Sequence, residues 1–163
     1  QLFSATGPSR ALPAGTSPVY RGPLDSVYAA GSHLFLLAMP DTNPVTEVTL
    51  LASDGTAAGT VPLRRFQWIE QPTAFAGRLF FAGQEPAYGT ELWSSDGTPA
   101  GTRIEADLMP GAANGVDPLD PAITVAAGML VFSGKTPEHG IEPRKWVPGG
   151  APPAVIRPPN RRL

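Results

Sequence analysis

A twelve-residue segment that occurs twice constrains this chain more than any other sequence feature. The segment 91–102 reads ELWSSDGTPAGT and the segment 49–60 reads TLLASDGTAAGT, so the two agree at eight of twelve positions. Their first residues, Thr49 and Glu91, are 42 residues apart. A period of about 20–50 residues is typical of repeat architectures in which each unit is one supersecondary motif. We therefore expect a fold built from repeated units.

Weaker copies of this segment stand near both ends of the chain. The segment 1–7, followed by Ala14-Gly15-Thr16, resembles a degenerate copy with a longer turn, and the segment 142–156 resembles another. Between the copies, a turn glycine precedes an apolar strand at residues 30–36, 76–81 and 127–132. Each glycine follows another short strand candidate, at residues 26–29, 73–75 and 123–126. The unit is therefore expected to be four short antiparallel strands.

The Asp-Gly pairs in the two strong copies predict hairpin turns. Asp-Gly between β-prone segments is typical of a type I′ turn, because both central residues of that turn need a positive φ. We expect Asp54-Gly55 and Asp96-Gly97 to be structural turn residues at hairpin tips.

The strands near these turns show two hydrophobicity patterns. The segment 103–108 alternates strictly, so Ile104, Ala106 and Leu108 are expected to face a core and the charged residues to face water. The segments 79–81 and 130–132 are apolar throughout. Such segments are typical of strands covered on both faces, as in a sheet that lies between two others.

Helix signals are nearly absent, because 20 Pro and 18 Gly residues interrupt almost every window long enough for a helix. We expect loops at residues 41–44, 83–88 and 110–120, the last projecting from the surface, and an irregular tail at residues 152–163. The chain is thus predicted to be all-β. Its length favours one domain over residues 1–163.

Composition excludes several classes of function. A net charge of -2, with one small basic cluster at residues 157–162, predicts no nucleic-acid binding. The absence of cysteine excludes disulfides, thiolate metal sites and a cysteine nucleophile. No apolar segment approaches the length of a membrane span. Because the chain begins with Gln1, we expect either a processed form or a fragment.

The string Glu91-Leu92-Trp93-x-x-Asp96-Gly97-Thr98-x-x-Gly101-Thr102 resembles the ELWxxDGT repeat family, known mainly from bacterial surface and secreted proteins, notably of myxobacteria. Gly77-x-Leu79-Phe80-Phe81 and Asp107-Leu108-x-Pro110-Gly111 match the usual continuation of that family. The resemblance is strong over residues 72–111, clear over 27–60 and weak at both ends. It implies β-propeller blades and a secreted or cell-surface location.

The repeated units correspond to about three and a half blades, at residues 1–24 in part, 25–66, 67–108 and 109–159. Propellers close with roughly four to eight blades. We therefore expect part of a larger propeller, completed by a second copy of the chain or by another polypeptide.

No residue constellation predicts a catalytic or metal centre. Asp54 and Asp96 are more typical of turn chemistry than of metal ligands, and the carboxylates of residues 107–120 follow no ligand spacing. With no cysteine, His33 and His139 do not by themselves make a zinc site. No metal or other cofactor is predicted. Trp68 and Tyr88 are the better contact candidates for a ligand, whereas Trp93 is expected to pack between blades.

Three functions remain open at this point. The first is a non-catalytic module that binds a protein or a glycan or builds an extracellular assembly. The second is a carbohydrate-active or other hydrolytic enzyme with carboxylates from Glu85, Glu138 and Glu142 near the propeller axis. The third is a structural fragment completed by another chain. A pocket with two converging carboxylates of shifted pKa would favour the enzyme over the binding module.

Overall fold

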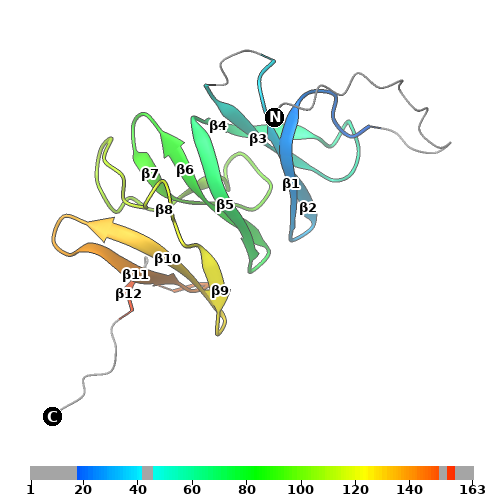
Figure 1. Ribbon diagram of the computed structural model, residues 1–163. Helices are drawn as coiled ribbons and strands as arrows, with labels where there is room; N and C mark the ends of the chain where they lie inside the picture. Colours follow the sequence, from blue (N-terminus) through cyan, green and yellow to red (C-terminus); the bar gives the residue numbers. More distant parts are fainter. Residues whose placement is uncertain (1–17, 42–45, 151–153, 157–163) are drawn as a thin grey trace, which may run out of the picture.

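The computed structural model describes residues 18–41, 46–150 and 154–156, and these residues form twelve strands and no helix. The strands belong to three separate four-stranded antiparallel sheets, in each of which neighbours in sequence are neighbours in the sheet (Figure 1). The all-β prediction is confirmed. The weak first copy, at residues 1–16, lies outside the described residues.

Each sheet is a simple up-and-down meander. The first contains β1 (Leu24–Ala30), β2 (His33–Ala38), β3 (Val48–Ser53) and β4 (Val61–Phe66). The second contains β5 (Trp68–Phe75), β6 (Arg78–Glu85), β7 (Gly89–Ser95) and β8 (Arg103–Ala106). The third contains β9 (Thr124–Ala126), β10 (Met129–Thr136), β11 (Gly140–Trp146) and β12 (Ala154–Val155). Because β6 continues to Glu85, the loop expected at residues 83–88 is shortened to 86–88.

The second sheet lies between the other two, so that its central strand β6 is buried on both faces. Leu79 and Phe81 belong to a hydrophobic cluster shared with the first sheet, whereas Phe80 belongs to a cluster shared with the third. All three side chains are inaccessible to solvent. The prediction for residues 79–81 is therefore confirmed. In the third sheet Leu130 and Phe132 are buried but Val131 is only half-buried, because no described sheet covers its face.

The first strands of the three sheets lie along the same side of the molecule. β5 contacts both β1 and β9, and Figure 1 shows these three strands in succession. Trp93 of β7 packs between the first and second sheets, where its ring meets Phe66 edge-on at 5.0 Å. The expectation that Trp93 has a packing role is thus confirmed for this pair of sheets.

The expected type I′ geometry is found at other turns than the Asp-Gly pairs. Ala76-Gly77 and Ala127-Gly128 have positive φ at both positions, and each joins directly paired strands. In contrast Asp54-Gly55 opens a seven-residue loop, 54–60, in which Gly55 has a positive φ and Asp54 does not. The same holds for Asp96-Gly97 in loop 96–102. The two-residue turn predicted for these pairs is wrong, because side-chain hydrogen bonds stabilise a wider loop.

The alternation expected over residues 103–108 is broken by a register shift in β8. Leu92 pairs with Ala106 but Trp93 pairs with Ile104, which leaves Glu105 as an extra residue. Such a bulge re-aims side chains. The Glu105 side chain is only 7% exposed, and it accepts hydrogen bonds from Ser94 Oγ and from Trp146 Nε1 of the third sheet. Glu105 therefore joins two sheets instead of facing water.

The connection between the second and third sheets lies against the molecule. Val116 is fully buried, and the backbone N–H groups of Gly115 and Val116 both donate to the Thr90 carbonyl. The prediction that residues 110–120 project from the surface is therefore wrong for the middle of the segment, whereas residues 110–113, 119 and 120 are exposed. In the tail, expected to be irregular, β12 forms the edge of the third sheet, and residues 157–163 lie outside the described part.

Candidate functional site: the cleft between the first two sheets

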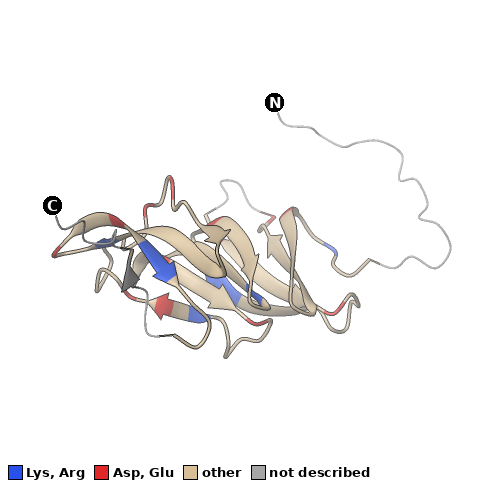
Figure 2. Ribbon diagram, turned by 90° about the horizontal axis from the view of Figure 1, so that it is seen from below, with Lys and Arg blue, Asp and Glu red and all other residues tan. Residues whose placement is uncertain are grey.

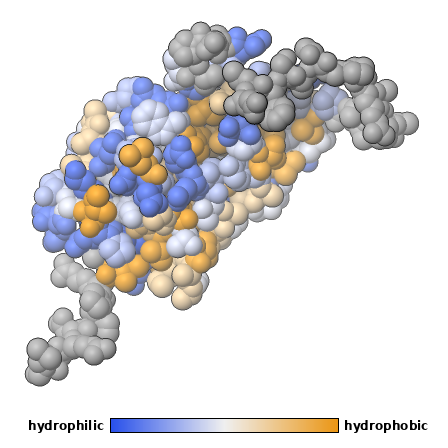
Figure 3. Space-filling view, viewed as in Figure 1, coloured by the Kyte–Doolittle hydropathy of each residue, from blue (hydrophilic) through white to orange (hydrophobic). Residues whose placement is uncertain are grey.

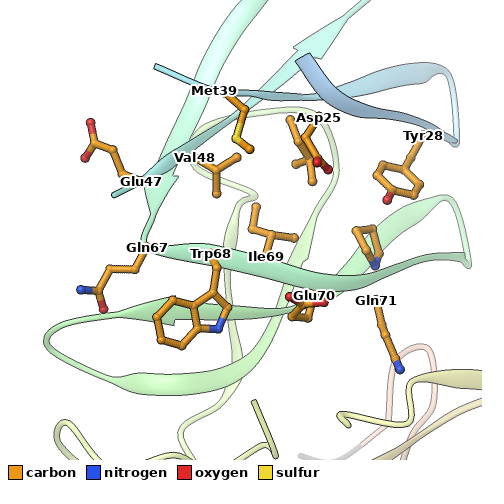
Figure 4. Close-up of a pocket in the computed structure, with 12 residues that line it drawn as sticks. Asp25, Tyr28, Met39, Glu47, Val48, Gln67, Trp68, Ile69, Glu70 and Gln71 are labelled. Carbon is orange, nitrogen blue, oxygen red and sulfur yellow. The ribbon is translucent and has the colours of Figure 1, made fainter. Parts of the chain in front are cut away.

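A cleft of about 680 Å³ lies where β1, β2 and β3 of the first sheet meet β5 of the second. Figure 4 shows its side chains, which come from both sides of the gap. We call this the β1–β5 cleft, and it is lined by Asp25, Tyr28, Leu37, Met39, Glu47, Val48, Gln67, Trp68, Ile69, Glu70, Gln71 and Pro72. It combines apolar, aromatic and acidic groups.

The β5 wall begins with the three residues Trp68, Ile69 and Glu70. Ile69 packs against the hydrophobic cluster shared by the first two sheets. Its neighbours Trp68 and Glu70 are exposed, Trp68 at 39%. Side chains alternate along a strand, so the half-buried Ile69 faces the first sheet, whereas Trp68 and Glu70 lie on the opposite face of β5. Trp68 thus lines a cleft, and its role as a ligand contact stays a prediction.

A bulge follows immediately along β5. The register shifts between Glu70 and Thr73, and Gln71 has a φ of 47°. A non-glycine residue in this region costs energy unless other contacts fix it. Here the Gln71 side-chain oxygen accepts the Ile123 N–H at 2.8 Å. The bulge is therefore tied to the segment that leads into the third sheet.

The opposite wall is the edge strand β1. Tyr28 is half-buried and packs against the same hydrophobic cluster as Ile69. Asp25 is exposed and accepts a hydrogen bond from Ser26 Oγ at 2.9 Å. In Figure 4, Asp25 and Tyr28 stand across the gap from Ile69, whereas Glu70 points to the other side of β5. The sequence reasoning missed this wall, since no motif links β1 to β5.

The charge of the β1–β5 cleft is acidic. Asp25, Glu47 and Glu70 line it, and no Lys, Arg or His is among its lining residues. Glu47 accepts a hydrogen bond from Arg65 Nη1 at 3.4 Å, in a pair that is largely exposed. Asp25 and Glu70 have no ion-pair partner within residues 18–41, 46–150 and 154–156. Two carboxylates are therefore available to a ligand.

Tyr88, the second contact candidate, does not line this cleft. It lies in the turn between β6 and β7, with its ring 6.4 Å from that of Trp93. Arg64 packs over Trp93 at 4.6 Å and donates to Glu85 through Nη2 at 2.9 Å. Tyr88 and Arg64 line a separate open depression. The two contact candidates thus belong to different surface features.

The three carboxylates considered for glycoside chemistry do not form a catalytic pair in the described part of the chain. Glu85 is paired with Arg64. Glu138 is exposed in the turn between β10 and β11, and Glu142 belongs to β11 in the third sheet. Because Glu85 and Glu142 are strand residues of different sheets, their expected position on loops is wrong.

Glu91 is the carboxyl group whose environment is most unusual. It is fully buried, and burial raises its pKa to about 7. The backbone N–H groups of Leu108 and Met109 donate hydrogen bonds to it, which lower the pKa but do not offset the effect of burial. A Cβ on Gly115 would approach its oxygens to 2.3 Å, so this glycine permits the loop to close over the carboxyl. Glu91 thus holds the connection between sheets and is shut off from solvent.

Asp54 and Asp96 act within their own loops. Each accepts hydrogen bonds from the backbone N–H and hydroxyl of the Thr two residues later, Thr56 or Thr98. These bonds lower the pKa of both carboxyls. No group of three or more His, Asp or Glu side chains suited to a metal ion occurs among the described residues.

The two histidines lie in different sheets. His33 begins β2, and its ring lies where a Cβ on Gly97 would come within 2.6 Å of Nδ1. It therefore contacts the Asp96 loop of the neighbouring sheet. His139 is exposed in the turn before β11.

Comparison with known proteins identified no matching family model, no similar curated protein and no similar solved structure. Within the described residues there is no helix of the length and apolarity needed to cross a membrane. Among the described residues, Lys and Arg are scattered over several strands (Figure 2).

Proposed function

We propose that this chain is a non-catalytic binding module that holds a protein or glycan partner in the β1–β5 cleft. The observation that carries the proposal is a cleft of about 680 Å³ between the edge strands β1 and β5, whose lining includes the exposed Trp68 indole. Ligand sites are concave and combine apolar surface with a few polar groups. Large amphipathic aromatic residues contribute most to such contacts.

The position of Glu91, the carboxyl whose pKa is raised, favours a binding role over hydrolysis. A glycosidase needs two carboxyl groups on either side of its scissile bond, one of them with a raised pKa. The carboxyl with a raised pKa here, Glu91, is buried and bound by backbone N–H groups. It has no access to a substrate.

The architecture we propose for the module is that of propeller blades of the ELWxxDGT type, displayed on or secreted from a bacterial cell. Two features support it: three consecutive four-stranded meanders stack face to face, and the loops 53–60 and 95–102 share six side-chain hydrogen bonds. The outer face of the first sheet carries buried apolar residues, Leu36, Ala38 and Leu51, with Tyr20 against them. A second copy or another polypeptide would continue the stack there.

The binding proposal is tested by screening the labelled chain against glycan and peptide arrays, with Trp68→Ala, Tyr88→Ala and Ile141→Ala as variants. Ile141 is a matched control, since it is an exposed apolar residue of the third sheet, 61% accessible. Ligands lost in Trp68→Ala and retained in the other two variants support the β1–β5 cleft. Loss confined to Tyr88→Ala would move the site to the other depression, and cleavage of a bound glycan would favour the enzyme.

A further inference from the structure

The two ends of the three-sheet stack have outer faces that no described sheet covers (Figure 1). At one end, Leu36, Ala38 and Leu51 form a small apolar cluster on the outer face of the first sheet. At the other end, Val131 of the third sheet is half-buried. On the side of the molecule drawn in Figure 3, hydrophobic and hydrophilic residues are interspersed. The ends of the stack are therefore the candidate surfaces for a partner.

The position of a residue after the first turn of its sheet indicates which way its side chain faces. These turns join the first two strands of each sheet and comprise residues 31–32, 76–77 and 127–128. Phe35 and Phe80 stand four residues after the start of their turns, and each packs into the cluster shared with the following sheet. Val131 has the same position in the third sheet. It therefore points to where a further sheet would follow.

The next position along the strand faces the opposite way. Phe81 and Phe132 stand five residues after the start of their turns, and each packs into the cluster shared with the preceding sheet. Leu36 has this position in the first sheet and belongs to its outer cluster. Among the described residues, the first sheet has no preceding neighbour and the third has no following one. The two open faces are thus the two halves of an interface that the chain forms twice within itself.

The interface between the first and second sheets includes contacts at their turns. A Cβ on Gly31 would lie 3.5 Å from the Cα of Gly77, so the first turns of these two sheets are adjacent. A Cβ on Gly97 would lie 2.6 Å from Nδ1 of His33, so the loop 96–102 lies against the start of β2. The same two contacts between a third sheet and another first sheet pair Ala127 with Ser32, and Met129 with Gly55.

The residues that would make these contacts are accessible at both ends of the stack. Ser32 and Ala127 are exposed turn residues. Nothing lies within 4 Å of the position of a Cβ on Gly55, in contrast to Gly97. The second sheet carries Ala76 at the position of Gly31 and still contacts the third sheet through β5 and β9, so an alanine is compatible with this arrangement.

The outer face of the first sheet also has room for a partner's side chains. Tyr20 packs against the outer cluster and covers part of it. Two hollows, of about 320 and 260 Å³, are both lined by Tyr20 and Leu51. A second sheet could therefore fill the space that Tyr20 leaves open.

We propose that two copies of this chain form a closed ring, in which the first sheet of each copy packs on the third sheet of the other. Two copies contribute six sheets, and propellers close with roughly four to eight blades. The two contacts are identical, as the two-fold symmetry of a dimer requires. This inference rests on the proposed blade architecture and names its partner, and it does not depend on the ligand of the β1–β5 cleft.

Disulfide cross-linking tests which surfaces meet, because the chain has no cysteine of its own. The variant carrying both Ser32→Cys and Ala127→Cys is oxidised and run on a denaturing gel without reductant. In the ring these positions lie as Gly77 and Gly31 do within one chain, within the Cα separation of about 7 Å that a disulfide requires. We expect most of the double variant to become a covalent dimer, and neither single variant to do so.

The matched control combines Ser32→Cys with Glu138→Cys, an exposed turn residue at the other end of β10, and should stay uncross-linked. Equal cross-linking of the control indicates random collision and overturns the inference. Cross-linking of Ser32→Cys alone overturns it too, because the first sheets of two copies would then meet each other.

Sedimentation of the parent chain tests the number of copies without any substitution. The expected mass is twice the 17.0 kDa of one chain. A mass that grows with concentration beyond that value indicates an open chain of copies instead of a ring, and a monomer removes the second copy. Either result overturns the inference.

A further pair of substitutions separates failure of the ring from failure of the stacked architecture. If the chain is a monomer but Phe80→Leu and Phe81→Leu both lower its stability, the stack stands and only the ring fails. If only one of these substitutions lowers the stability, the stacked architecture fails as well.

Discussion

At the scale of residues, hydrogen bonds within the loop explain nearly every position of the repeated Ser-Asp-Gly-Thr-x-x-Gly-Thr sequence. In loop 95–102, Ser95 Oγ accepts the Gly97 N–H and exchanges a hydrogen bond with Thr102, while Thr98 Oγ accepts the Gly101 N–H. A Cβ on Gly101 would come within 2.0 Å of Asp96. The loop thus satisfies its own polar groups, and only a glycine fits beside the carboxylate.

Removal of one hydroxyl from this network should lower stability measurably. Ser95 is fully buried, so Ser95→Ala leaves the Gly97 N–H and the Thr102 hydroxyl without this partner. We expect the free energy of unfolding to fall by about 1–2 kcal/mol, measured by urea denaturation. The control Ser32→Ala, in an exposed turn, should change it by less than about 0.5 kcal/mol. Equal effects would contradict a structural role for the loop.

Glu91 predicts a stability that depends on pH. Its pKa in the folded state is about 7, above the ordinary value of 4.5. Between these values the folded state binds more protons than the unfolded state, so stability decreases as pH rises from about 4.5 to about 7. The loss should be on the order of 2 kcal/mol.

The variant Glu91→Gln tests this origin, because an amide keeps an acceptor oxygen but does not titrate. Urea unfolding of the variant should show little change of stability across this pH range. A slope as steep as that of the parent chain would assign the effect to other groups. Below this range the lowered pKa values of Asp54 and Asp96 act with the opposite sign, since their stabilisation is lost as pH falls.

At the scale of elements, substitutions in the inner strand β6 test whether the second sheet is covered on both faces in solution. Phe80 packs on Trp146 of the third sheet at 4.7 Å, and Phe81 packs on Phe66 of the first at 5.3 Å. We expect Phe80→Leu and Phe81→Leu each to cost about 1–2 kcal/mol. If one face of the second sheet were exposed to solvent, only one of these two substitutions would lower the stability by this amount. The exposed Ile141→Ala is the control, with an expected change below about 0.5 kcal/mol.

The strand order and the burial of residues 79–81 on both faces could be predicted from sequence, because both depend on local hydrophobicity patterns. The fate of Glu105 could not, since it depends on a single extra residue in β8 and on Trp146, which is 41 positions away. The wide Asp54 and Asp96 loops were also missed, because Asp-Gly alone does not reveal the flanking Ser and Thr bonds. Local patterns predicted the strands, whereas side-chain hydrogen bonds determined the bulge in β8 and the width of the Asp54 and Asp96 loops.

At the scale of the whole molecule, the proposed continuation of the stack predicts an assembly. Val27 is 52% exposed and pairs with Leu36, so it lies on the outer face of the first sheet. Sedimentation should give a mass above the 17.0 kDa of one chain when its partner is a second copy. Val27→Asp should then return the mass to that of one chain without loss of the far-UV circular dichroism spectrum. A parent chain that sediments as a monomer would exclude completion by a second copy.

The candidate site shows where sequence reasoning ended. Trp68 was selected as an exposed amphipathic residue, but Asp25 and Tyr28, which line the same cleft, precede it by some forty positions and share no motif with it. An alternating Trp68-Ile69-Glu70 triplet at the start of a strand was the available signal. The cleft itself could not be predicted without knowing that β1 lies opposite β5.

The sequence by itself determined that this protein is all-β, that glycine turns precede apolar strands and that the second sheet is covered on both faces. These properties follow from hydrophobic period and turn chemistry, which act over a few residues. Only the tertiary structure decided that Glu91 and Glu105 are buried and that β1 and β5 enclose a cleft. The physical reason is that burial and cleft shape depend on contacts between sheets, which no local pattern encodes.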